Sequence, residues 1–264
     1  MTILRRLALS LQRLVLLALL VLGWELAAGD LVDGVELISP FFVSSPSRIY
    51  DDLVLGFTED TLARDTIATL TEAGLGLAIG MTSGIAVGLV FSFWRWLGQL
   101  LEPFMAVLNA LPRPALAPLA ILWFGLGSTS KIFVAWSLVF FVAFYNTLDG
   151  VRAIDRDMLN AIRVMQPSRW QLIRLAIIPA VVAWVFAAFR ISVSLALIGA
   201  IVGEFVGATR GLGYQLVAAQ GLLNTDRVFS VFVLTAVLAA LLLGVARQVE
   251  NAVLRWRPKA ELAV

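Results

Sequence analysis

Long apolar runs, separated by short polar stretches, set the pattern of this chain. A run of about 20 apolar residues is long enough to cross a membrane as a helix. Taken with their flanking residues, the runs predict transmembrane helices at 1–29, 66–93, 100–124, 131–148, 176–206 and 228–245. The fold predicted from this pattern is an all-α polytopic membrane protein with six spans.

The first apolar run follows three basic residues, Arg5, Arg6 and Arg13. Such a start is also typical of a cleaved signal peptide, which here would end near residues 27–29. The run is long enough to span, so we expect it to be retained as the first transmembrane helix. Segment 30–65 is acidic, is broken by two prolines and holds few basic residues. We expect this segment outside the membrane, on the periplasmic side, with part of it along the interface.

The second and third spans hold residues that predict how they pack. Glycines recur every four residues in the second span, at Gly76, Gly80, Gly84 and Gly88. Small residues at this spacing let the backbone of another helix approach closely. Prolines free backbone carbonyls, which is tolerable at membrane depth only inside protein or beside a water-filled cavity. The third span holds four of them, Pro103, Pro112, Pro114 and Pro118.

The longest polar stretch between spans is predicted to form two short helices joined by a turn. Asp155 suits the start of the first helix, where a carboxylate meets the positive end of the helix dipole. Met158, Ile162 and Met165 then fall at i, i+4 and i+7, which places them on one apolar stripe. Pro167 ends this helix, because proline disfavours the helical conformation in the residue before it.

The second short helix is predicted to begin after Ser168. Ser168 and Gln171 have the spacing of a capping box, in which each side chain binds the backbone N–H of the other residue. Trp170 lies in the first turn of this helix. One interpretation of the whole stretch is an ordinary solvated loop. Its apolar side chains favour the other interpretation, a surface on which a partner docks.

The arginines predict which side of the membrane each segment occupies. They gather in segment 149–175 and in the tail 251–264, and basic segments next to spans stay in the cytoplasm. We therefore expect both termini and the polar stretch to be cytoplasmic. The membrane core is 66–250, with segment 149–175 as its cytoplasmic loop.

Composition narrows the possible chemistry. The chain of 264 residues is 60% hydrophobic and 14% charged, with a mean hydropathy of +0.92. It contains no cysteine and no histidine, which excludes thiolate chemistry and the commonest general base and metal ligand. It also lacks the glycine-rich phosphate loop that binds ATP. We expect no catalytic residue, metal site or cofactor in the chain, and no nucleic-acid partner.

Ionisable residues inside spans are candidates for a solute pathway, because they are costly to place in lipid. Arg190 and Arg113 could offer positive charge to an anionic solute in a central cavity. Alternatively, Arg190 could form a structural pair with Glu72 or Glu204. Glu204 itself is expected to be structural or related to a gate. The remaining candidates could line the cavity or bind between helices; they are Asn109, Tyr145, Asn146, Ser192 and Ser194.

Several stretches together resemble the permeases of binding-protein-dependent ABC importers. The stretch from Asn160 to Pro179, NAIRVMQPSRWQLIRLAIIP, is similar to the EAA loop of that family. LPRPALAPLAILWFGLGSTSKIF, NTLDGVRAID, FRISVSLALIGAIVGEF, GLGYQL and the RWR tail are similar, in this order, to its nitrate, sulfonate and taurine branch. Together they cover most of residues 66–257.

The resemblance implies a type I importer permease in a bacterial inner membrane. It implies a second permease subunit, with a homodimer expected, and a periplasmic or lipid-anchored binding protein that delivers the solute. A cytoplasmic ATPase dimer would bind the ATP and magnesium, and membrane lipid would surround the spans. The polar loop would be the coupling loop that docks on the ATPase, through Asp155, Met158, Asn160, Ala161, Ile162, Met165, Gln166, Pro167, Ser168 and Trp170.

The loop departs from the family pattern at three positions. Asn160 replaces the usual Glu, Ile162 replaces the second Ala, and Gln166 replaces a Gly that supplies a left-handed turn. The solute implied by the branch is small and anionic, such as nitrate, a sulfonate or taurine. One alternative is a neutral or aromatic solute, such as a pyrimidine precursor. A different class of alternative is a stand-alone secondary transporter or channel, with Glu72 as the coupling carboxylate.

Overall fold

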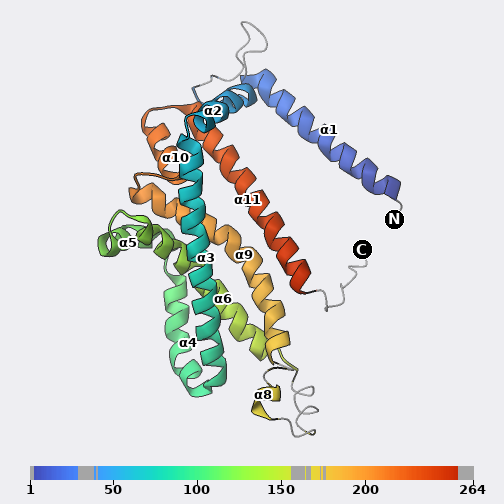
Figure 1. The fold of residues 1–264 in the computed structure, drawn as a ribbon, viewed down its shortest axis with the longest axis vertical. Coiled ribbons are helices and arrows are strands. Elements are labelled where there is room, and N and C mark those ends of the chain that lie inside the picture. The colour runs from blue at the N-terminus through green and yellow to red at the C-terminus, as the bar shows by residue number, and fades with distance from the viewer. Residues whose placement is uncertain are drawn as a thin grey trace.

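A computed structural model describes residues 3–28, 39, 41–155, 164, 168–172, 174 and 177–254. Within these ranges the regular structure is entirely helical (Figure 1). The elements in chain order are α1 Ile3–Ala28, α2 Pro46–Thr58, α3 Thr61–Phe93, α4 Arg95–Ala110, the 3-10 turn η1 Arg113–Ala115, α5 Leu116–Phe124, α6 Ser128–Arg152, α8 Arg169–Leu172, α9 Ile178–Gly207, α10 Leu212–Gly221 and α11 Thr225–Val253.

Five helices of the described chain are long and apolar enough to cross a membrane: α1, α3, α6, α9 and α11. The pair α4 and α5 makes a sixth span if it is taken as one broken helix, bent by 82° at η1. The prediction of six spans is confirmed in this sense. The prolines at 112 and 114 flank Arg113 in the break itself. The third span, predicted as one helix rich in proline, is therefore two helices that meet at a sharp bend.

The glycine stripe of α3 packs directly against α6, as its spacing predicts. A Cβ atom on Gly84 would lie 2.5 Å from the carbonyl oxygen of Phe140. A Cβ on Gly80 would lie 2.6 Å from the Cβ of Val139, and one on Gly76 would lie 2.5 Å from the Cβ of Ala135. Only glycine lets the two backbones come this close.

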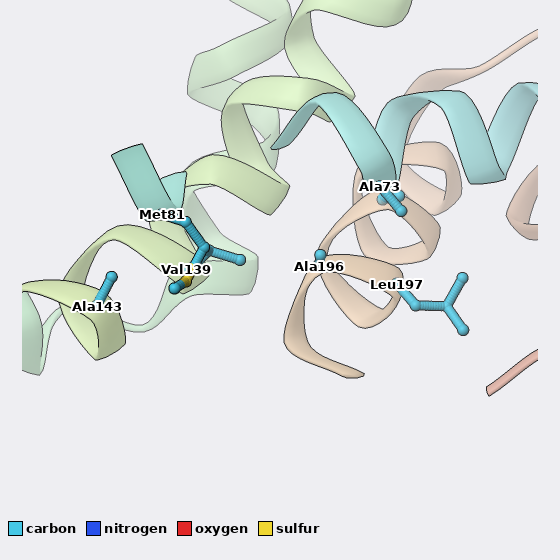
Figure 2. Close-up of a cluster of buried hydrophobic side chains, with 7 residues drawn as sticks. Ala73, Met81, Val139, Ala143, Ala196 and Leu197 are labelled. Carbon is cyan, nitrogen blue, oxygen red and sulfur yellow. The ribbon is translucent and has the colours of Figure 1, made fainter. Parts of the chain in front are cut away.

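The core of the bundle lies where α3, α6 and α9 meet. Figure 2 shows Ala73 and Met81 from α3 packed with Val139 of α6 and with Ala196 of α9. Most of the buried side chains in this cluster are alanine, so the three helices can approach one another closely. In Figure 1 α1 diverges from the other helices, whereas α11 runs beside α9 and packs against this core through Ala239 and Leu242.

The two ends of the bundle carry different short elements (Figure 1). One end, called here the α10 end, carries α2 and α10, and the opposite α8 end carries α8. Proline at the start of α2 follows the N-cap Ser45, whose hydroxyl accepts from the backbone N–H of Arg48. Helix α10 has ten residues, too few to span, as its sequence predicts. At the α10 end α1 joins α2 through Glu25, which accepts hydrogen bonds from the backbone and the hydroxyl of Ser47.

Several helix ends differ from their predicted positions, and three of them change how a segment is described. Helix α3 starts at Thr61, five residues before the predicted start of the second span. Helix α6 continues to Arg152, so the first residues of the predicted loop 149–175 belong to a span. Helix α11 reaches Val253, so the predicted tail 251–264 begins inside a helix. Hydrophobic runs underestimate helix length, because helices continue past the apolar part into their polar ends.

Candidate functional site

At the α8 end the predicted capping box is present. The backbone N–H of Ser168 donates to Oε1 of Gln171 at 2.8 Å, and the backbone N–H of Gln171 donates to Oγ of Ser168 at 3.3 Å. The second predicted helix is therefore confirmed as α8. Trp170 projects from it and is 65% exposed. Asp155 is exposed just beyond α6, and the other predicted coupling residues lie outside the described residues: Met158, Asn160, Ala161, Ile162, Met165, Gln166 and Pro167.

At the break between α4 and α5, Arg113 is held by three neighbours. Its Nη2 donates to both the carbonyl oxygen and Oδ1 of Asn109, each at 2.9 Å. Its Nη1 lies 3.4 Å from the carbonyl oxygen of Ser137 on α6. The guanidinium carbon lies 4.2 Å from the centre of the Phe141 ring, which is a cation–π contact. These contacts fix the position of a positive charge at the bend.

The other predicted pathway residues divide into two groups. Tyr145 lies one helical turn from Phe141 on α6 and close enough to Arg113 for their charges to interact. Asn146, by contrast, donates from Nδ2 to the carbonyl oxygen of Val142 in its own helix, at 2.9 Å. Ser192 and Ser194 lie on α9, where Ser192 is fully buried and Ser194 partly so. The structure thus places Arg113 between Asn109 of α4 and the ring of Phe141 on α6.

Arg190 pairs with a residue that the sequence did not predict. Its Nη1 lies 3.7 Å from Oε2 of Glu250 on α11, and its side chain is 47% exposed. Arg190 therefore pairs with a carboxylate, as the structural alternative expected, but the partner is Glu250 rather than Glu72 or Glu204. The long side chain reaches toward the last turn of α11 at the α8 end, away from the middle of the span, as basic side chains near helix ends do.

Glu204 joins three helices at the α10 end. It is 1% exposed, and its Oε1 accepts from the hydroxyl of Thr69 on α3 at 2.7 Å. Its Oε2 accepts from the backbone N–H of Gly213, in the first turn of α10, at 2.5 Å. The preceding N–H groups donate to Asp65 and to the Thr69 hydroxyl, from Gly211 and Leu212 respectively. Side chains from α3 and α9 thus satisfy the free N–H groups at the start of α10.

Lys131 and Glu72 complete this buried polar cluster, and the sequence analysis gave neither a place in it. Lys131 is 2% exposed and donates to the carbonyl oxygens of Leu126 and Gly207 at 2.5 Å and of Gly127 at 3.2 Å. Glu72 is 3% exposed, and the charges near it include those of Lys131 and Glu204. The sequence feature that could have indicated this cluster is the presence of one lysine and two glutamates within apolar spans. Which of them meet depends on helix packing.

Two neighbouring cavities of the described chain are apolar. One of about 410 Å³ lies between α3, α9 and the end of α11, lined by residues such as Met81, Phe186 and Phe189. A second, of about 220 Å³, adjoins it. Among the described residues no group of three or more acidic side chains could hold a metal ion.

Comparison with known proteins gives three similar permeases. The riboflavin transport system permease protein of Chloroflexus aurantiacus is 33% identical over 242 residues, which cover 92% of this chain and 88% of that protein. The putative aliphatic sulfonates transport permease protein of Bacillus subtilis is 29% identical, over 89% of this chain and 86% of its own length. The taurine transport system permease protein of Escherichia coli is 28% identical, over 93% and 89%.

Solved structures share the fold. An inward-facing form of the MetNI methionine ABC transporter matches with a TM-score of 0.65 and 18% sequence identity, over 74% of this chain and 97% of the matched chain. The family described as the binding-protein-dependent transport system inner membrane component matches residues 76–255. This match covers the glycine stripe, the broken span, the α8 region and, from the buried cluster, Lys131 and Glu204. The chain therefore belongs to this family and is an ABC importer permease of the binding-protein-dependent type.

Proposed function

We propose that the chain is the transmembrane subunit of an ATP-driven importer in a bacterial inner membrane. Two copies form the pathway, a cytoplasmic ATPase dimer binds ATP and magnesium, and a periplasmic or lipid-anchored binding protein delivers the solute. We assign the α8 end and both termini to the cytoplasm. The arginine distribution supports this orientation, because basic segments next to spans stay on that side.

The observation that carries the coupling role is Trp170 on α8. This side chain is 65% exposed on a four-residue helix outside the spans, and the capping box fixes that helix at its start. A large exposed aromatic residue on a fixed element is typical of an interface anchor. In the proposed complex Trp170 packs into the ATPase, and the apolar residues Met158, Ile162 and Met165 extend the same contact.

The solute we propose is small and anionic, such as nitrate, a sulfonate or taurine. The sulfonate and taurine permeases among the relatives support this class. A neutral or aromatic solute is the second candidate, favoured by the riboflavin permease and by a formylaminopyrimidine permease that is 29% identical. Uptake of each class by the assembled transporter separates the two candidates.

Co-purification with the ATPase tests the coupling role. We expect wild-type protein, solubilised in detergent, to recover an ATPase subunit, and Trp170→Ala to weaken that association roughly tenfold, as expected for loss of a buried aromatic anchor. The matched control is Trp123→Ala, because Trp123 is 60% exposed on α5 inside a span. A permease that recovers no ATPase even as wild type would contradict the proposal and favour a stand-alone secondary transporter.

A further inference from the structure

Arg113 lies at the middle of the membrane-spanning bundle. It contacts Ser137 and the ring of Phe141, and both lie near the centre of α6, which spans Ser128–Arg152. The guanidinium therefore sits far from either end of this span. A charge at that depth is costly against lipid, so such a residue faces protein or water.

No acidic side chain within the described residues forms an ion pair with Arg113. The ion pairs of the other described arginines join Arg152 to Glu102, Arg190 to Glu250 and Arg227 to Asp52. The positive charge of Arg113 is held instead by uncharged groups, namely the amide of Asn109, a backbone carbonyl and an aromatic face. These partners orient the guanidinium without neutralising it.

The guanidinium also keeps donors for a ligand. Arginine has five N–H donors in a planar fork. The hydrogen bonds within the described chain use Nη2 twice, both times on Asn109, and Nη1 once, at the long distance of 3.4 Å. Nε and the second N–H of Nη1 are the donors left over. Each of them can donate a charge-assisted hydrogen bond to an oxyanion.

The surroundings allow a solute to reach this charge. Arg113 is partly buried, and Asn109 beside it is exposed. The bend of 82° turns α5 away from α4 at this point and leaves the turn η1 between them. Irregular backbone at membrane depth is tolerated where it lines a cavity or is covered by protein. Tyr145, near Arg113 on α6, adds a hydroxyl to the same region.

We propose that the Arg113 guanidinium, positioned by Asn109 and Phe141 at the bend between α4 and α5, binds the oxyanion group of the transported solute and selects anions over neutral solutes. This inference rests on the proposed function, an importer of a small anionic solute. It makes Arg113 the residue that distinguishes anionic from neutral solutes. Asn109 is a positioning residue, because it holds the guanidinium through its own side chain and carbonyl.

The absence of native cysteine allows a direct test. Arg113→Cys carries the sole thiol of the chain. The variant is reconstituted with its ATPase and binding protein in proteoliposomes, and uptake of nitrate, ethanesulfonate, taurine and riboflavin is measured. We expect anion uptake to fall roughly tenfold or more, as for loss of hydrogen bonds to a charged group. Modification with an aminoethyl methanethiosulfonate, which restores a positive charge, should recover most of it, and a sulfonatoethyl reagent should not.

Two controls separate this role from a purely structural cap on α4. Arg13→Gln removes a cation from α1 and should leave anion uptake unchanged. A thiol introduced as Leu122→Cys, 77% exposed on α5, reports the reactivity of a lipid-facing position. The thiol at 113 should react with the water-soluble reagents at least tenfold faster. Equal, slow reaction at both positions would overturn the inference whatever the solute.

The uptake results distinguish failure of the inference from failure of the proposed function. Wild-type uptake of one of the three anions, left unchanged by Arg113→Gln, would overturn the role of Arg113 alone. Wild-type uptake of none of them would overturn the anionic solute class and the role of Arg113 with it. Equal loss of anions and riboflavin in Arg113→Cys, with no recovery by the cationic reagent, would show that the residue acts as a structural cap and would also overturn the inference.

Discussion

The ammonium group of Lys131 on α6 donates a 2.5 Å hydrogen bond to the carbonyl oxygen of Gly207, the last residue of α9. Two further carbonyls, of Leu126 and Gly127, accept from the same nitrogen. One buried cation therefore ties the end of α9 to the turn that precedes α6. Helices that apolar packing brings together along their length are joined here at the α10 end by charge.

Replacing this cation should destabilise the bundle. Lys131→Met removes the donor from three carbonyls and leaves the nearby carboxylates of Glu72 and Glu204 without a compensating charge. Breaking such a buried charged arrangement costs about 3–5 kcal/mol. Thermal unfolding of the detergent-solubilised protein measures the loss. Thr129→Ala, two residues away and exposed, is the control, and an equal unfolding temperature for both variants would refute the role of Lys131.

Removal of the Glu204 carboxylate should loosen α10. Glu204→Ala deletes the acceptor for the backbone N–H of Gly213 and for the hydroxyl of Thr69. A buried donor left without its acceptor costs about 1–3 kcal/mol, so amide exchange in α10 should speed up roughly tenfold. Hydrogen–deuterium exchange read by mass spectrometry follows this change. Gln220→Ala, exposed on the same helix, should leave exchange as in wild type.

The glycine stripe predicts opposite effects for two alanine substitutions on one helix. Gly84→Ala places a Cβ 2.5 Å from a carbonyl oxygen of α6, and overpacking of this kind costs about 1–3 kcal/mol. Gly74→Ala meets nothing within 4 Å and should gain about 0.5–1 kcal/mol, because alanine favours the helix. Unfolding of both variants in the same detergent compares them. A stable Gly84→Ala would mean that α3 and α6 lie further apart than described.

The capping box at α8 should affect assembly through local order. Ser168→Ala removes the acceptor for the Gln171 backbone N–H, and loss of an N-cap costs about 1 kcal/mol. We expect severalfold weaker recovery of the ATPase, with no change in the amount of permease in the membrane. Ser168→Asn should restore recovery, because asparagine is an equally good N-cap. Failure of asparagine to rescue would point to a direct contact of Ser168 with the partner.

The ion pair between Arg190 and Glu250 should contribute little to stability. It is 3.7 Å long, and the arginine is nearly half exposed, so a double-mutant cycle with Arg190→Gln and Glu250→Gln should give a coupling energy below about 1 kcal/mol. The same variants test the predicted role of Arg190 in the pathway. A loss of solute uptake in Arg190→Gln that Glu250→Gln does not share would support that role.

Features set by local spacing could be predicted from the sequence. The four glycines of α3 predicted close packing, and α6 supplies the partner for each of them. Ser168 and Gln171 predicted the start of α8, because a capping box depends on two residues three positions apart. The prolines of the third span indicated irregular backbone there, although no break was predicted. The bend angle of 82° depends on how α4 and α5 pack against α6, which spacing does not encode.

Features set by packing between distant segments could not be predicted. Glu204 binds Thr69, which is 135 residues away, and Arg190 pairs with a residue on the last helix. Hydropathy assigns each residue to a span but leaves open the rotation of that span about its axis. The sequence therefore predicted a structural or gate-related role for Glu204 but not its partners. It placed Arg190 in the middle of a span, although the length of its side chain carries the charge toward the α8 end.

The match between the glycines of α3 and the residues of α6 also limits how these two helices can slide. Side chains of α6 pack against the glycines that recur every four residues on α3; they are Ala135, Val139, Ala143 and Thr147. Four residues of helix rise by about 6 Å. The two helices can therefore slide past each other only in steps of this length, because any smaller shift places a side chain of α6 against a non-glycine residue of α3. In smaller movements of the permease, α3 and α6 must move together as one rigid body, and the surrounding helices change position relative to this pair.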